Sequence, residues 1–72
     1  MKLIMITPQE CNTINNVDMV TVPGSEGSFT VLRGHASLVS SLHKGVVLYD
    51  GQQIAINGGV VEVHNDTITI IT

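Results

Sequence analysis

The segment from Val22 to Leu38 reads VPGSEGSFTVLRGHASL and combines turn-forming residues with a short apolar run. Its Pro-Gly and Ser-Glu-Gly steps favour tight turns, because proline restricts φ and glycine adopts positive φ without steric cost. Phe29, Val31 and Leu32 are expected to anchor the segment in a core. Gly34 is expected to reverse the chain. The segment therefore predicts short strands joined by tight loops.

Two hairpins are predicted in the second half of the chain. Asp50-Gly51 favours a type I′ turn, which needs positive φ at both central positions, and this turn sets Val47 opposite Ile54. Both faces of that hairpin carry apolar side chains, so it should be packed on both sides, either by a second sheet of the same domain or by a partner.

The last hairpin is predicted to turn at Asn65-Asp66, which pairs Val63 with Ile68 and Val61 with Ile70 on one face. Burying each of these branched side chains contributes about 1.5–3 kcal/mol to folding. Polar residues share the opposite face, so a slip of one residue would expose the whole apolar set. The register of this hairpin is therefore strongly specified.

The first strand is predicted to alternate, with Leu3 and Met5 facing the core and Ile4 and Ile6 facing outward. Two outward isoleucines form either a contact surface for another protein or a site that a neighbouring segment of the same domain covers. The residues alone do not decide between these alternatives.

A further strand is predicted from Val17 through Val20 to Val22, with a bulge near Asp18-Met19 where the spacing of the valines breaks. No segment shows a sustained helical period with caps. Regularly spaced short strands predict an all-β fold. We expect one domain over residues 1–72, a small β-sandwich or flattened barrel of about eight to ten mostly antiparallel strands.

Charged residues make up 12% of the 72 residues, and the net charge is −3. Soluble domains carry roughly 25% charged residues, so we expect other proteins to cover part of this surface. The sequence has no stripe of basic residues of the kind that binds nucleic acid. No apolar run approaches the ~20 residues that are needed to span a bilayer. A secretory signal is not expected, because Thr7-Pro8 interrupts the first apolar run. Cys11 is the only cysteine, so no internal disulfide is possible.

Residues that carry chemistry are few and scattered. The three histidines and Cys11 lack the spacing of zinc ligands, and Ser25 lies outside a G-x-S-x-G nucleophile pattern. Gly58-Gly59 precedes a predicted strand rather than a helix, which favours a close approach of two backbones over a phosphate-binding loop. We therefore expect no catalysis, no metal, no cofactor and no small-molecule substrate.

Two motifs resemble the ATP synthase epsilon subunit family. The segment Val22 to Leu38 is similar to the family's loop of Pro-Gly, Ser-Glu-Gly, Phe-Gly-Val-Leu and Pro-Gly-His-Ala-Pro-Leu, and Gly58 to Val63 is similar to its Gly-Gly strand ending in Val-Glu-Val. Leu3 to Pro8 also fits the family's first strand, so the resemblance covers nearly the whole chain. It implies a β-sandwich in a non-catalytic rotor subunit that fastens gamma to the c-ring during ATP synthesis coupled to proton transport.

The resemblance also implies two contact surfaces. Ser25, Glu26, Ser28 and His35 correspond to the exposed polar edge that lies toward the c-ring, and Glu26 is the expected ion-pair partner of a basic ring residue. Candidates for contact with gamma are the outward Ile4 and Ile6, together with Arg33. The implied location is peripheral, at the cytoplasmic face of the energy-coupling membrane, with the bacterial inner membrane as the expected one.

Three positions depart from the family pattern. Thr30 replaces a glycine, and Arg33 and Ser37 replace prolines, so the loop loses two fixed φ angles and gains a positive charge. Most family members continue into a helical hairpin that inhibits ATP hydrolysis and in some cases binds ATP. This sequence ends at Thr72, so we expect no C-terminal helical domain and neither activity. The alternative function is an autonomous β-sandwich interaction module that self-associates through a sheet edge or through Ile4 and Ile6.

Overall fold

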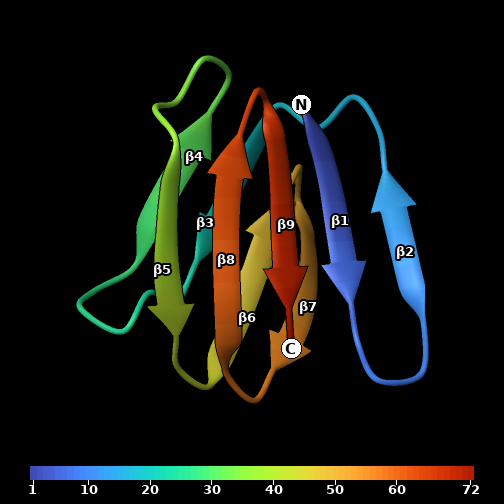
Figure 1. Cartoon of the computed structure of the whole chain (residues 1–72), viewed down its shortest axis with the longest axis vertical. Coiled ribbons are helices and arrows are strands. Elements are labelled where there is room, and N and C mark those ends of the chain that lie inside the picture. The colour runs from blue at the N-terminus through green and yellow to red at the C-terminus, as the bar shows by residue number, and fades with distance from the viewer.

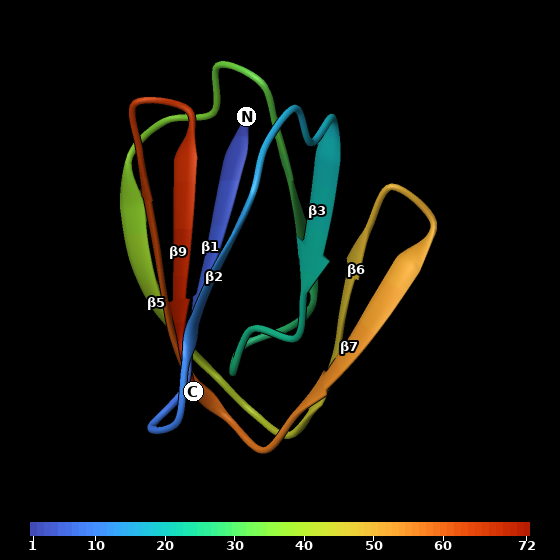
Figure 2. The ribbon, with the colours of Figure 1, turned by 90° about the vertical axis from the view of Figure 1, so that its right-hand side faces the viewer.

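Nine strands in two sheets, without a helix, form the computed structural model, which describes all residues from Met1 to Thr72. Sheet A has the strand order β2-β1-β9-β8-β5 and sheet B the order β4-β3-β6-β7, and the two sheets pack face to face (Figure 1, Figure 2). This confirms the predicted all-β sandwich. The strands are β1 (Lys2–Ile6), β2 (Cys11–Ile14), β3 (Met19–Val22), β4 (Phe29–Leu32), β5 (Leu38–Leu42), β6 (Gly45–Tyr49), β7 (Gln52–Ile56), β8 (Gly59–His64) and β9 (Thr67–Ile71).

The core lies between the two sheets and contains only apolar side chains. Period-2 alternation supplies it, because every second residue of a strand points to the same face. Sheet A contributes Leu3, Met5, Leu42, Val61, Val63, Ile68 and Ile70, and the remaining buried side chains are Val17, Val20, Val22, Val31, Val47 and Ile56. No polar or charged side chain is buried with them, so the core needs no internal hydrogen-bond network.

Both predicted hairpins have the predicted registers. Val47 pairs with Ile54 across the Asp50-Gly51 turn, and Val63 pairs with Ile68 across the Asn65-Asp66 turn. Asn65 and Asp66 have φ values of 50° and 55°, as a type I′ turn requires. The turn residues therefore determine the register within two hairpins, which together contain four of the nine strands.

One pair of neighbouring strands is parallel. β1 lies beside β9 in sheet A, with Leu3 opposite Ile68 and Met5 opposite Ile70. Leu3 and Met5 are buried there, and Ile4 and Ile6 point outward and are half-buried, as predicted. The first and last strands of the chain thus lie side by side near the middle of one sheet (Figure 1).

Two predictions of detail were wrong. Val17 is buried but lies outside β3, which begins only at Met19, so the irregular spacing marks the start of the strand rather than a bulge within it. The carboxylate of Asp50 accepts hydrogen bonds from the backbone N–H groups of Asp18 and Met19 at 3.2–3.3 Å, and these bonds fix the start of β3.

The second wrong prediction concerns Leu32, which does not anchor the core. Its side chain is 54% exposed, because its neighbour Val31 already occupies the inward position on β4.

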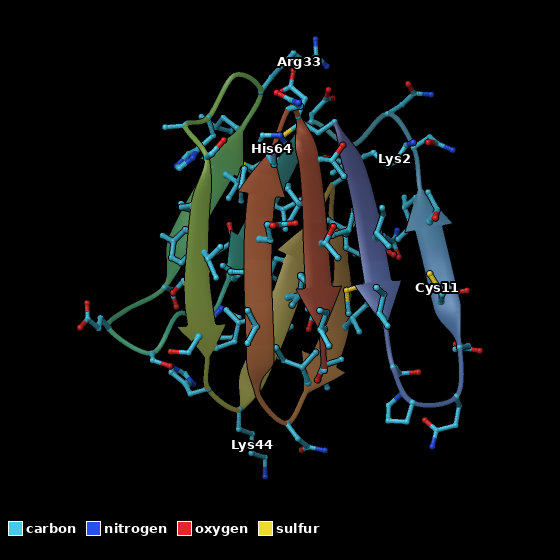
Figure 3. All side chains as sticks on the ribbon, in the orientation of Figure 1. Lys2, Cys11, Arg33, Lys44 and His64 are labelled. Carbon is cyan, nitrogen blue, oxygen red and sulfur yellow. The ribbon has the colours of Figure 1, made fainter.

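The sandwich has two ends, which differ in their loops. The upper end in Figure 1 contains the loops at residues 15–18, 33–37, 50–51 and 65–66 together with the N-terminus. The lower end contains the loops at residues 7–10, 23–28, 43–44 and 57–58 together with the C-terminus. Arg33 marks the upper end and Lys44 the lower end in Figure 3. Residues that are close together in a sequence motif can therefore lie at opposite ends of the sandwich.

Candidate interaction surfaces

The turn at the lower end presents Ser25 and Glu26 to solvent. The N–H of Gly27 donates to the carbonyl of Gly24 at 3.0 Å, which makes Ser25 and Glu26 the two central residues of a tight turn. Two further hydrogen bonds attach the turn to β5, from the Ser25 N–H to the Ser41 carbonyl at 3.0 Å and from the Ser41 hydroxyl to the Ser25 hydroxyl at 2.9 Å. The turn is therefore a fixed projection from the sandwich rather than a free loop.

Close packing behind this turn explains why glycine occupies position 24. Gly24 is buried, and a Cβ there would lie 2.9 Å from Cε1 of Phe29 and still closer to the carbonyl oxygen of Gly27. The half-buried ring of Phe29 thus packs behind the turn and against the core. This agrees with the prediction that Phe29 anchors the segment in the core. Glu26 forms no ion pair within the chain, so its carboxylate is available to a partner.

The predicted ring-facing residues do not form one continuous edge. Ser28 is exposed next to the Ser25-Glu26 turn, at the lower end. His35 lies beyond the far end of β4, where the N–H of neighbouring Gly34 donates to Oδ1 of Asp66 at 2.7 Å, at the upper end. Sequence proximity suggested one edge, but β4 lies between Ser28 and His35 and carries the chain from one end of the sandwich to the other.

The outer face of sheet A carries an apolar patch that includes both predicted isoleucines. Ile6 pairs with Ile71, and Ile71 pairs with Val60, so the three side chains form a row across three strands. Ile4 lies one row above, and Val39 on β5 lies in the same row as Ile4 and is 70% exposed. Thr69 and Glu62 separate these two apolar side chains in that row. We call Ile4, Ile6, Val39, Val60 and Ile71 the sheet A patch. The neighbouring strands leave the two isoleucines partly exposed, so the face can contact another protein.

Arg33 lies apart from the sheet A patch. It belongs to the loop between β4 and β5 at the upper end (Figure 3), and its guanidinium Nη2 lies 3.1 Å from Oδ1 of Asp18. Both side chains are largely exposed, so this ion pair contributes at most about 1 kcal/mol. The structure thus gives Arg33 a partner within the chain and does not place it with Ile4 and Ile6.

The outer face of sheet B carries a second apolar patch, which the motifs did not predict as a whole. Met19 and Leu32 form a cross-strand pair, and Val46 and Leu48 lie on the neighbouring strand β6. Each is 40–54% exposed. The sequence signal for this second patch was the β6–β7 hairpin, which carries apolar side chains on both of its faces. Sheet A can cover only one of these faces, so the other is left exposed.

No arrangement suited to metal chemistry occurs on these surfaces. No three His, Cys, Asp or Glu side chains lie close enough together to hold a metal ion, and Cys11 carries an exposed free thiol on β2 (Figure 3). His64 contacts the Ser37 hydroxyl through Nδ1 at 3.2 Å and the Asn65 side-chain amide through Nε2 at 3.1 Å, all in exposed positions. No helix of the length and hydrophobicity needed to cross a bilayer is present.

Comparison with known proteins identifies the family. The model of the ATP synthase delta/epsilon chain β-sandwich domain matches residues 1–72. The chain belongs to this family. Among its relatives, the ATP synthase epsilon chains of Sulfurovum sp. and Magnetococcus marinus are 45% and 41% identical to it, over 99% and 96% of its length. The chain spans 59% and 53% of the length of these two relatives.

Solved structures agree with this assignment. A chain in the Euglena gracilis mitochondrial ATP synthase, in the OSCP/F1/c-ring structure, superposes with a TM-score of 0.83 at 26% identity and covers 97% of this chain and 48% of its own length. A chain in the central stalk and c-ring structure of the Tetrahymena thermophila enzyme gives a TM-score of 0.84 at 17% identity, covering 97% and 60%. The Tetrahymena likeness is evidence of fold alone. Chains that are only 26% and 17% identical to this one thus share its sandwich fold.

Proposed function

We propose that this delta/epsilon-family sandwich is a non-catalytic subunit of the central stalk of an F-type ATP synthase, where it fastens the gamma subunit to the c-ring. A subunit that connects two others in this way needs a stiff domain with two contact surfaces that point in different directions. The sheet A patch on one face and the Ser25-Glu26 turn at the lower end meet this requirement. Family membership, supported by relatives named ATP synthase epsilon chain, is the observation that carries the proposal.

Gamma is the proposed partner of the sheet A patch, in which Ile4 and Ile6 are central. Apolar contact over several strands gives affinity, whereas an exposed charge such as Arg33, which lies apart from the patch at the upper end, adds little. The c-ring is the proposed partner of the turn, where Ser25, Glu26 and Ser28 are exposed together. His35, at the opposite end, has no part in this ring contact.

The proposed location follows from these partners. A subunit held between gamma and the ring is peripheral to the membrane, on the cytoplasmic face of a bacterial inner membrane, and takes part in ATP synthesis driven by proton transport. It binds no cofactor or small-molecule substrate in this role. The alternative of an autonomous self-associating module is not favoured, because relatives of this chain are named ATP synthase epsilon chain.

Calorimetric titration of the chain against gamma from the same organism tests the proposal. We expect saturable one-to-one binding, and absence of binding to folded gamma would overturn the stalk assignment. Ile6→Glu should weaken binding at least about tenfold, because it places a carboxylate in an apolar contact. Leu48→Glu is the matched control, since it introduces the same charge on the outer face of sheet B. Equal losses from both variants would remove the sheet A patch from the interface.

Attachment to the c-ring tests the role of the turn. Glu26→Lys should weaken co-purification of the ring with the gamma complex, and Glu26→Gln should have a smaller effect of up to about fivefold, because an exposed ion pair contributes at most about 1 kcal/mol. Both effects should shrink at high salt, which screens exposed charges. Ring attachment that is unchanged by Glu26→Lys at low salt would exclude Glu26 from the contact.

A further inference from the structure

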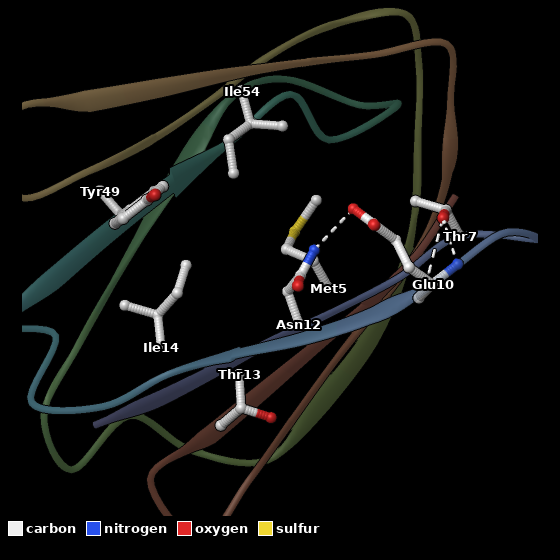
Figure 4. Close-up of a pocket in the computed structure, with 8 residues that line it drawn as sticks. All are labelled: Met5, Thr7, Glu10, Asn12, Thr13, Ile14, Tyr49 and Ile54. Carbon is white, nitrogen blue, oxygen red and sulfur yellow. Dashed lines mark hydrogen bonds between the residues drawn. The ribbon is translucent and has the colours of Figure 1, made fainter.

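A cleft opens along one side of the sandwich, between β1 and β2 of sheet A and β6 and β7 of sheet B. Its volume is about 390 Å³, and Ile14, Tyr49 and Ile54 line it beside the buried Met5 (Figure 4). The β6–β7 hairpin tilts away from β1 and β2 along this side (Figure 2). A volume of this size is typical of pockets that bind ligands or a few side chains.

Asn12 is one of the residues that line the cleft. It pairs with Met5 on the inner face of β2, at a position where the alternation of the strand would place an apolar side chain. Asn12 is exposed there, which leaves its polar amide in contact with solvent at the mouth of the cleft. Ile14, Tyr49 and Ile54 are left half-buried, with apolar surface facing the gap.

The rim of the cleft carries one charged side chain, Glu10, which forms no ion pair within the chain. Oε1 of Glu10 accepts a hydrogen bond from the Asn12 side-chain amide at 2.9 Å, and the β1–β2 turn is held by the bond from the Glu10 N–H to Oγ1 of Thr7 at 3.1 Å. No lysine or arginine lines the cleft, and the single ion pair of the chain is elsewhere. A cation that complements Glu10 must therefore come from another molecule.

The walls favour a polypeptide as that molecule. β2 and β7 are both edge strands, each paired on one side only, so backbone N–H and C=O groups along the rim are free to bind an extended segment. β2 also separates the cleft from the outer face of sheet A by the width of a single strand, since Ile6 pairs directly with Cys11. A partner on the sheet A patch can therefore continue around the β2 edge into the cleft.

We propose that the cleft binds a segment of the gamma subunit that inserts an apolar side chain between Ile14 and Ile54 and places a lysine or arginine against Glu10. This inference rests on the proposed function and adds a second, more specific contact to it. The apolar side chain completes the open side of the core, and the cation supplies the charge that the rim lacks.

Binding of cleft variants to gamma, measured by calorimetry, tests the inference. Glu10→Lys should weaken binding about tenfold or more, because it replaces attraction by repulsion, and Ile14→Ser should weaken it by removing apolar contact. Ala36→Lys is the control, since it adds a positive charge at an exposed loop residue that does not line the cleft and should leave gamma binding within about twofold. Glu10 is exposed, so its variant is expected to fold.

Each outcome is decisive. If wild-type chain binds gamma and both cleft variants bind equally well, the cleft is not part of the interface and only this inference fails. If wild-type chain does not bind gamma, the stalk assignment fails together with it. Sedimentation of the chain alone adds a further outcome, because a dimer that Glu10→Lys dissociates would identify a second copy as the occupant and overturn the assignment to gamma.

Discussion

Gly59→Ala should destabilise the sandwich by at least about 3 kcal/mol, and it should leave little folded protein if the stability of the chain is low for its size. A Cβ at Gly59 would collide with the carbonyl oxygen of Ile71 and would lie 3.0 Å from its carbonyl carbon and 3.1 Å from Cα of Thr72. All three atoms belong to the backbone of β9 or of the residue that follows it, so no side-chain rotation relieves the overlap. Gly59 also has a φ of 139°, which L-residues rarely adopt.

Gly27→Ala is the control that separates the clash from the backbone strain. Gly27 has a similar φ of 132°, but a Cβ there would meet no atom within 4 Å. Its alanine variant should therefore lose only the conformational part, about 1–2 kcal/mol. Urea denaturation of the two variants measures the difference. Equal destabilisation would show that β8 and β9 can move apart at Gly59 and that their close approach is not required.

Asn65→Pro should have the second large effect, a loss of about 3 kcal/mol or more. Proline fixes φ near −65°, whereas Asn65 has a φ of 50°. The substitution therefore prevents the turn that joins β8 to β9. Because β9 also pairs with β1, this change disturbs the middle of sheet A rather than its edge.

Asn65→Gly is the matched control for the proline variant. Glycine adopts positive φ, so the turn should form and stability should change by less than about 1 kcal/mol. The hydrogen bond from the Gly34 N–H to Asp66 should also survive. Urea denaturation monitored by circular dichroism compares the two. A proline variant as stable as the glycine variant would contradict the assignment of the register to this turn.

Local sequence signals predicted the features of this fold that depend on neighbouring residues. The turns at Asp50-Gly51 and Asn65-Asp66 each have positive φ built into their central residues, so the hairpin registers follow from the turns themselves. The alternation in β1 likewise separated Leu3 and Met5 from Ile4 and Ile6. The extent of β3 could not be predicted in this way, because its start depends on Asp50, which is 32 residues away from Asp18.

The candidate surfaces were only partly predictable for the same reason. Ser25 and Glu26 are adjacent in sequence and share one turn, whereas His35 follows β4 and therefore lies at the other end of the sandwich. The sheet A patch requires Val60 and Ile71 beside Ile6, which depends on the parallel pairing of β1 with β9. The cleft depends on the distance between Asn12 and Ile54 in different sheets. Pairings between residues far apart in sequence leave no local pattern.

The place of β9 in sheet A has a consequence for how the protein is made. β9 lies between β1 and β8, so the first strand of the sandwich has as its parallel neighbour the last strand of the sandwich to be translated. Leu3 and Met5 must remain without their final packing until Ile68 and Ile70 have emerged. Pairing between such distant segments slows folding and leaves apolar strands exposed in the meantime. Folding of this sandwich during translation must therefore be completed from its C-terminal strand.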